Sequence, residues 1–401
     1  MSAATVPVPP QVGDPDALER LLAALDGSAG ATRYIGGWVR DTLLGDTPQD
    51  IDIATRLPPD EALRRAEAAG LHVWSSASGL AHGTIGVVVG GKTIEVTTLR
   101  RDVATDGRHA EIAFTDDWRE DAARRDFTIN ALSADPLDGA IHDYFGGLAD
   151  LERGCVRFIG DPETRIAEDH LRILRFFRFH ARFGRDEPDA ASYAACVARS
   201  KDLMALSRER IAGELLKLLA VADPVPAVAA MLAGGLFAPM LPEIVATDRL
   251  AALVATEQAA GSAPDGLRRL SALLPADARI AEQIGARLKL SNADRKRLAR
   301  AADPVDASAE ALVYGYGTAS AVDMALLAGE PERARIAAAW QAPKLPISGG
   351  ELIRLGLTPG PIVAATLQRI ERQWVADGFP GGVAFEALVA EVVAQALRSR
   401  Q

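Results

Sequence analysis

The sequence predicts an α+β fold, with an N-terminal α/β head built on a mixed sheet and a long all-helical remainder. Two apolar stretches at residues 84–89 and 93–99 flank the pair Gly90-Gly91, which is a strong signal for a β-hairpin. Residues 50–54 alternate acidic and apolar side chains, as a half-buried strand does. Beyond Glu163 strand patterns nearly vanish, and alanine- and leucine-rich helical patterns continue to the C-terminus.

Local patterns predict the other elements of the head. After a flexible lead at residues 1–14, the leucine spacing from Leu18 to Leu25 predicts an amphipathic helix over residues 15–25. A short strand at 33–35, a helix start at 39–44 and a helix at 58–69 are expected next. Residues 101–117 have little periodicity, and we expect them to form a mobile loop.

The composition is that of a soluble globular protein, with 48% hydrophobic and 24% charged residues among 401. The longest uncharged run, residues 224–242, contains four prolines, so we expect no membrane-spanning segment. The first residues have neither the basic flank nor the apolar stretch of a secretory signal. Because there are only two cysteines, we expect a cytoplasmic protein without a disulfide scaffold.

The basic residues are clustered, so the formal net charge of −10 does not exclude a polyanionic ligand. Six arginines lie between Arg165 and Arg185, and six lysines or arginines lie between Arg287 and Arg300. The second cluster is either a solvated basic helix or a set of contacts to an RNA backbone. Its candidate RNA-binding residues are Lys289, Arg295, Lys296, Arg297 and Arg300.

Asp50 and Asp52 are the first candidates for chemistry. Residues two apart on a strand point to the same face, so both carboxylates are expected to project together. Adjacent carboxylates repel each other unless a cation lies between them, and Mg²⁺ takes one or two carboxylates together with substrate phosphates. The alternative interpretation is two solvated acids in a loop. Glu95, in the second hairpin strand, is the candidate third carboxylate, or else a surface residue.

The pair Gly36-Gly37 lies between a predicted strand and a predicted helix. Glycines there let a ligand approach the backbone, and amides at a helix start can hold phosphate. Arg40 could add a charge-assisted contact to the same phosphate. A glycine turn, an arginine and a carboxylate pair so close together are more specific for a phosphate-binding site than any one of them.

Arginines at every third position mark the segment 165–183, which we expect to be helical: Arg172, Arg175 and Arg178. Their mostly apolar neighbours imply that the arginines need anionic partners, either on a ligand or as internal salt bridges. Asp169 and Arg172 form a selective pair, because a carboxylate only accepts hydrogen bonds and a guanidinium only donates them. Cytosine and adenine place an amino donor beside a ring-nitrogen acceptor, so the pair suits C and A and clashes with U and G.

Four segments occur in a recognisable order: IGGWVRDTLLGDTPQDIDIAT, RRDFTINAL, EDHLRILRFFRF and SRERIAGELLKLL. Together they resemble the class II nucleotidyltransferases, which comprise tRNA CCA-adding enzymes and bacterial poly(A) polymerases. The resemblance covers about residues 30–242. It implies a nucleotidyltransferase head at 15–150, a helical nucleotide-recognition neck at 151–220, and a helical body and tail at 221–401 that binds tRNA.

The resemblance also implies roles for individual residues. Arg125 and Asp126 are expected to contact the nucleotide, and Asp169 with Arg172 to act as a protein template for its base. Gly37 and Arg40 would belong to the same nucleotide site. Arg175 and Arg178 would reach the triphosphate or support the base-reading pair, and Arg210 would brace it.

The reaction implied is attack of an RNA 3′-hydroxyl on the α-phosphate of CTP or ATP, with Mg²⁺ held by Asp50 and Asp52. Bacterial poly(A) polymerases carry a basic, aromatic segment after the hairpin, whereas this chain has ATDGRHAEIAFTDDWRED there, which favours CCA addition to tRNA. The alternatives are a poly(A) polymerase and an enzyme adding only C or only A. Outside these are a small-molecule nucleotidyltransferase and a non-catalytic RNA-binding module.

Overall fold

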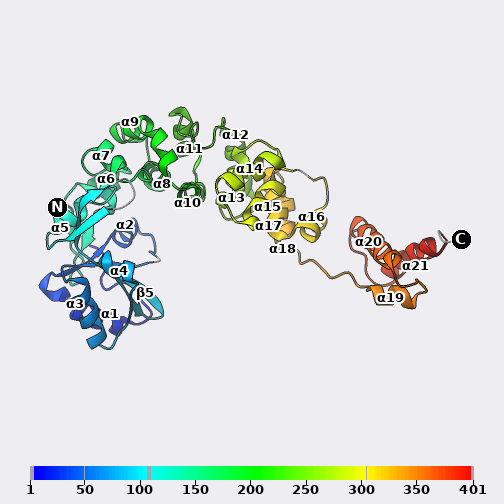
Figure 1. Ribbon diagram of the computed structural model, residues 1–401, viewed down its shortest axis with the longest axis horizontal. Helices are drawn as coiled ribbons and strands as arrows, with labels where there is room; N and C mark the ends of the chain where they lie inside the picture. Colours follow the sequence, from blue (N-terminus) through cyan, green and yellow to red (C-terminus); the bar gives the residue numbers. More distant parts are fainter. Residues whose placement is uncertain (1–3, 49, 106–109, 304, 399–401) are drawn as a thin grey trace. The chain divides into compact units, whose positions relative to one another are not determined.

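A computed structural model describes residues 4–48, 50–105, 110–303 and 305–398. The chain divides into two compact units, Met1–Pro242 and Glu243–Gln401. The expected α+β class is confirmed: all described strands lie in the first unit, and every described element after β9 (Ile141–His142) is helical. In Figure 1 the strands accordingly lie in the blue and cyan part of the chain.

The head is built on a mixed sheet in the order β3-β4-β5-β2-β1-β8-β9. Only the β2–β5 pair is parallel among these neighbours. The predicted hairpin is confirmed, and Gly90 and Gly91 have φ of 57° and 79°, as a two-residue turn requires. The other strands are β1 (Thr32–Ile35), β2 (Asp52–Thr55), β3 (His72–Trp74), β4 (Thr84–Val89), β5 (Lys92–Thr98) and β8 (Ser133–Ala134).

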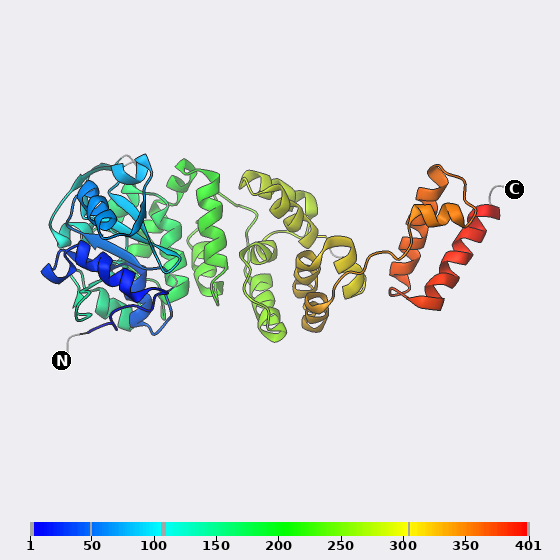
Figure 2. The same ribbon diagram turned by 90° about the horizontal axis from the view of Figure 1, so that it is seen from below.

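Helices α1 (Pro15–Ala24) and α3 (Pro59–Ala68) lie side by side, as Figure 2 shows in dark blue. Their leucines and alanines form part of the core, since Leu18, Leu21 and Ala66 are fully buried. The remaining helical elements of the head are η1 (Gly27–Ala29), α2 (Gly37–Leu43), α4 (Ala77–Ala81), α5 (Trp118–Ala123), η2 (Thr128–Asn130) and α6 (Gly147–Arg153).

Residues 101–117, expected to be a mobile loop, largely form a second, two-stranded sheet. β6 (Arg100–Thr105) pairs antiparallel with β7 (Ala110–Phe114), with an irregularity between Asp102 and Ala104. The expectation is wrong for these strands because backbone pairing forms them although two large apolar side chains lie in solvent: Val103 is 59% exposed and Phe114 is 47% exposed. Residues 106–109 of the expected loop lie outside the described residues.

Residues 4–14, expected to be a flexible lead, lie against the head. The N–H of buried Val6 donates to Gly139 O at 3.0 Å, and Thr5 forms a bridge with Ala140. Gly13 approaches Gly90 so closely that a Cβ on Gly13 would lie 2.9 Å from Gly90 O. Because backbone contacts to distant residues hold this segment, its own composition does not indicate that it is ordered.

The first unit continues in helices that include α8 (Arg172–Phe183). The one helix expected at 165–183 is interrupted, since α7 ends at Glu168 and Asp169 has extended backbone angles, φ −151° and ψ 107°. Phe176 and Phe177 of α8 are fully buried, and α8 contacts α10 and α11, so α11 belongs to the first unit. The other helices are α7 (Pro162–Glu168), α9 (Ala190–Ala198), η3 (Ser200–Ala205), α10 (Arg208–Leu219) and α11 (Val225–Ala233).

The buried apolar residues of the second unit include two separate clusters. One contains Leu312 and Met324, and the other contains Ile370, Trp374 and Phe385. No helix in the described part of the chain is long and apolar enough to cross a membrane. The helices are α12 (Asp248–Ala260), α13 (Gly266–Leu273), α14 (Ala278–Arg287), α15 (Asn292–Ala301), α16 (Ala309–Tyr316), α17 (Thr318–Leu327), α18 (Pro331–Ala339), α19 (Gly349–Arg354), α20 (Pro361–Ala376) and α21 (Gly382–Arg398).

Candidate active site

The glycine turn and two of the predicted carboxylates meet at one end of the sheet. Gly36 follows β1 with φ 65°, so the chain turns sharply into α2. Asp52 pairs with Ile35 of antiparallel β1 and with Glu95 of parallel β5. A Cβ on Gly36 would lie 3.9 Å from Asp52 Oδ2. A ligand bound at the turn would therefore lie next to the Asp52 carboxylate.

Two other carboxylates, Glu95 and Asp50, lie close enough to Asp52 to affect its ionisation. Burial raises the pKa of Asp52 above its ordinary value, and the negative charges of Glu95 and Asp50 raise it further, whereas Arg125 lowers it. Asp50 is exposed and precedes the strand, because β2 begins at Asp52 and not at residue 50 as expected. The charges of Glu95 and Asp50 therefore disfavour the ionised form of Asp52.

A metal at this position would need further ligands. Within residues 4–48, 50–105, 110–303 and 305–398, no group of three or more His, Cys, Asp or Glu side chains is arranged to hold an ion. Mg²⁺ commonly completes its coordination with water and substrate phosphates. The donor set of Asp50 and Asp52 therefore fits an ion that binds together with a nucleotide.

Arg125 and Arg40 both lie beside the glycine turn, and a Cβ on Gly37 would lie 3.6 Å from Arg40 Nη2. A Cβ on Gly36 would lie 3.4 Å from Arg125 Nη1, and Arg125 Nη2 donates to Asp121 Oδ2 at 3.2 Å. Arg40 is only 5% exposed, and its guanidinium donates to Asp41 and Asn130. The arginine nearest to the turn and Asp52 thus comes from a segment far along the chain, which local spacing could not indicate.

Asp126 is buried, and hydrogen bonds occupy both of its carboxylate oxygens. Oδ1 accepts from Phe127 N and from Asn130 Nδ2, both at 2.9 Å, and Oδ2 accepts from Arg175 Nε at 2.8 Å. Burial alone would raise the pKa of Asp126, but the Arg175 charge and these hydrogen bonds hold it below its ordinary value. The structure therefore joins two predicted nucleotide-contacting residues, Asp126 and Arg175, in an ion pair.

The predicted base-reading residues lie at the junction between α7 and α8. Asp169 is held by Arg210, whose Nη2 is 3.0 and 2.9 Å from the two carboxylate oxygens, as expected for a bracing residue. Arg172 does not pair with Asp169. Its Nη1 pairs with Glu168 at 2.5 Å, and its Nη2 donates to Arg124 O at 3.2 Å. Asp169 remains 30% exposed and keeps acceptor capacity for a base.

The arginine row forms internal ion pairs in this structure. Arg178 Nε donates to Glu214 Oε2 of α10 at 2.7 Å, as Arg175 pairs with Asp126 and Arg172 with Glu168. Sequence reasoning missed Glu168 and Glu214 as partners. A carboxylate three or four residues from an arginine is a detectable signal for Glu168, but Glu214 becomes a neighbour of Arg178 only through the packing of α8 on α10.

The basic residues proposed to contact RNA divide into two groups. Arg297 pairs with Asp323 and with Asp265, and Arg295 pairs with Glu282, so both guanidinium groups have acidic partners inside the second unit. Lys289, Lys296 and Arg300 are exposed. For these three exposed residues, contact with an RNA backbone stays a prediction.

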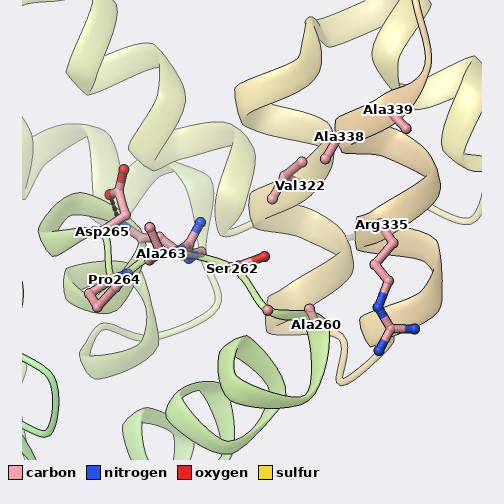
Figure 3. Close-up of a pocket in the computed structure, with 11 residues that line it drawn as sticks. Ala260, Ser262, Ala263, Pro264, Asp265, Val322, Arg335, Ala338 and Ala339 are labelled. Atoms are coloured by element: carbon pink, nitrogen blue, oxygen red, sulfur yellow. Dashed lines mark hydrogen bonds between the residues drawn. The ribbon is translucent and has the colours of Figure 1, made fainter.

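One cavity of the head and one of the second unit are relevant to ligand binding. One of about 1010 Å³ adjoins Asp50 and is lined by Trp38, Lys92 and residues of the lead. Another, of about 580 Å³, lies in the second unit between the loop 260–265 and helices α17 and α18 (Figure 3). Its buried Arg268 donates to Glu257 at 2.7 Å and to Ala263 O at 2.6 Å, so this guanidinium already has protein partners.

Two segments of the chain match known protein families. Residues 32–157 match the family described as "Poly A polymerase head domain". Residues 187–247 match the family described as "Probable RNA and SrmB- binding site of polymerase A". The first segment contains the glycine turn, the carboxylates and Asp126, and the second contains Arg210 and Glu214.

Several proteins are similar over most of their length. "CCA tRNA nucleotidyltransferase 1, mitochondrial" of Mus musculus is 34% identical over 366 residues, which cover 86% of this chain and 83% of the relative. The "CCA-adding enzyme" of Limosilactobacillus fermentum is 30% identical over 375 residues, covering 88% and 91%. The Bacillus stearothermophilus CCA-adding enzyme, crystallised in complex with CTP, has a TM-score of 0.71 and 26% identity, covering 94% and 98%.

Proposed function

Because this chain belongs to the class II CCA tRNA nucleotidyltransferase family, we propose that it adds C, C and A to tRNA 3′ ends from CTP and ATP, releasing pyrophosphate. The observation that carries the proposal for this chain is the position of Asp52 beside the glycine turn, paired in register with Glu95 and close enough to Asp50 to feel its charge. Transfer of a nucleotidyl group needs such an arrangement to position the triphosphate and the attacking hydroxyl.

Enzymes of this family depend on a divalent metal, and Asp50 and Asp52 would hold Mg²⁺ in this chain. Burial first, and then the charges of Glu95 and Asp50, raise the pKa of Asp52; a cation beside this side chain would stabilise its ionised form, which supports the assignment. When bound, Mg²⁺ activates the RNA 3′-hydroxyl and offsets charge on the transferring and leaving oxygens. Glu95 lies beside Asp52 in the sheet. Its proposed role is to add negative charge that favours a bound cation there.

The remaining residues bind and select the nucleotide. Arg125 at the glycine turn is placed to offset triphosphate charge, and Gly37 begins α2, whose N-terminal amides can donate to phosphate. Asp126, as a carboxylate, is the proposed acceptor for a ribose hydroxyl. Asp169 and Arg172 read the base by accepting from the amino group and donating to the ring nitrogen of C or A.

The second unit is the proposed tRNA-binding region, where Lys289, Lys296 and Arg300 supply exposed positive charge for backbone phosphates. A cytoplasmic location is part of the proposal, supported by two free cysteines. The mammalian relatives carry "mitochondrial" in their names. Similarity to them therefore supports the activity and does not support a cytoplasmic location.

The direct test uses three tRNA substrates that end before CCA, after C and after CC. Each is incubated with one nucleoside triphosphate at a time, and the new ends are sequenced. We expect CTP to extend the first two and ATP to extend only the third. Runs of A on every end would instead identify a poly(A) polymerase, and a stop after CC with both nucleotides present would identify a C-only enzyme.

Replacing Gly36 with alanine is expected to lower kcat/KM for CMP incorporation about tenfold. The left-handed φ of 65° is unfavourable for an L-residue by about 1–2 kcal/mol, and the new Cβ would lie 3.4 Å from Arg125 Nη1. Gly70→Ala is the matched control, because Gly70 has φ 74° but no atom lies within 4 Å of the place that a Cβ would take there. Equal effects of both substitutions on kcat/KM would argue against a site at the glycine turn.

A further inference from the structure

A chain of hydrogen bonds links the helix after the glycine turn to the arginine row of α8. Arg40 Nη1 donates to Asn130 Oδ1, and Asn130 Nδ2 donates to Asp126 Oδ1 at 2.9 Å. Asp126 Oδ2 in turn accepts from Arg175 Nε at 2.8 Å. We name the four residues Arg40, Asn130, Asp126 and Arg175 the relay. It connects α2, η2 and α8, which are far apart in the sequence.

A second set of contacts fixes the Arg40 end of the relay to α8. Arg40 Nε donates to Asp41 Oδ1 at 2.7 Å, and Asp41 Oδ2 accepts from Arg182 Nη2 at 3.3 Å. The Arg40 guanidinium carbon also lies 4.3 Å from the ring centroid of Phe183. Arg40 is therefore held on one side by its own helix and on the other by the last turn of α8.

Three members of the relay are buried and satisfied by protein groups, while the Arg175 side chain is 31% exposed. Arg40 is 5% exposed, and Asn130 and Asp126 are each 8% exposed. Buried polar groups that satisfy one another hold the elements that carry them in one arrangement, since displacing any member leaves another without a partner. The relay thus ties the position of α2, and with it the glycine turn, to the position of Arg175 on α8.

We propose that Arg40 is a positioning residue for nucleotide selection, acting through Asn130 and Asp126 on Arg175 and the base-reading end of α8. The inference rests on the proposed function and deepens it, because it concerns the selection of C and A at that site. It differs from the expectation that Arg40 contacts a phosphate. A phosphate contact would serve all four nucleoside triphosphates equally, whereas a positioning role affects their discrimination.

The experiment measures kcat and KM for CTP and UTP with a tRNA lacking CCA, in the wild type and in Arg40→Met. We expect the ratio of kcat/KM for CTP over that for UTP to fall about tenfold. Arg64→Met is the matched control, because Arg64 is 66% exposed and pairs with Glu61 of its own helix. If the KM for both nucleotides rises equally while the ratio is unchanged, Arg40 is a phosphate contact and the inference is overturned.

A double-substitution cycle tests the route. Arg40→Met combined with Arg175→Met is expected to reduce discrimination no further than the larger single effect, because both substitutions interrupt one relay. If the loss of discrimination in the double variant equals the product of the two single losses, Arg40 and Arg175 act independently, which would contradict the proposal.

Asn130→Ala keeps the test decisive if Arg40→Met fails to fold. It removes the link while leaving the Arg40–Asp41 and Asp126–Arg175 ion pairs in place. We expect the same loss of discrimination as in Arg40→Met, and thermal unfolding identifies any loss of folded protein. Unchanged discrimination in folded Asn130→Ala overturns the relay. A wild type that adds no CCA would instead contradict the proposed function, so the two failures are distinguishable.

Discussion

Replacing Asp52 with asparagine is expected to lower nucleotide incorporation about a thousandfold while leaving the protein folded. The loss follows because asparagine removes one of two charged metal ligands, and metal assistance to phosphoryl chemistry contributes several kcal/mol. Single-turnover incorporation of CMP into tRNA at saturating Mg²⁺ measures the effect. Asp60→Asn is the matched control, because Asp60 is an exposed aspartate in the first turn of α3.

The same substitution is expected to leave thermal stability unchanged or raised. The pKa of Asp52 is raised in the folded protein by burial and by Glu95 and Asp50, so its ionised form is disfavoured by folding at neutral pH. Folding stability from this group is therefore greatest at acidic pH and is lost as the pH rises through the folded pKa, and a neutral asparagine avoids that loss. Normal incorporation by Asp52→Asn, or its failure to fold, would contradict the assignment of Asp52 as a ligand in a repelling cluster.

Replacing Asp169 with asparagine is expected to reduce the preference for CTP over UTP about a hundredfold. A carboxylate can only accept hydrogen bonds, whereas an amide can also donate to the carbonyl of uracil. The substitution also weakens the contact by which Arg210 holds this side chain. The measurement is the ratio of kcat/KM values for the two nucleotides with one tRNA substrate.

Asp186→Asn provides the control for Asp169→Asn, because Asp186 is exposed and follows the end of α8. Its CTP preference should equal that of the wild type. If Asp169→Asn lowers the rates with CTP and UTP by the same factor, Asp169 supports folding or catalysis in general and does not read the base.

Local patterns were sufficient for four strands of the sheet, β1, β2, β4 and β5. The strands at β4 and β5 and the hairpin between them were predictable because alternation and a glycine pair are encoded within a few residues. The Asp52–Glu95 pairing depends on β2 and β5 being neighbours in this register, which local patterns do not encode. By contrast, backbone pairing forms β6 and β7 although Val103 and Phe114 are exposed, so burial of apolar side chains gave little signal for them.

The partners that come from distant segments were not predictable from the spacing of the arginines. Arg40 lies next to the glycine turn in sequence, yet its guanidinium pairs with Asn130 and stacks near Phe183, which packing alone brings together. Arg125 occupies the place beside the turn because of the fold. The break between α7 and α8 was also missed, since residues 165–183 carry no proline or glycine to mark it.

The most direct test of the account is a crystal of the protein grown with Mn²⁺ in place of Mg²⁺ and with an unreactive CTP analogue. Anomalous diffraction locates the manganese independently of the protein atoms. We predict a peak within about 2.5 Å of carboxylate oxygens of both Asp50 and Asp52, shared with the triphosphate beside Gly36. A nucleotide and metal bound elsewhere, with both carboxylates directed away from them, would contradict the account.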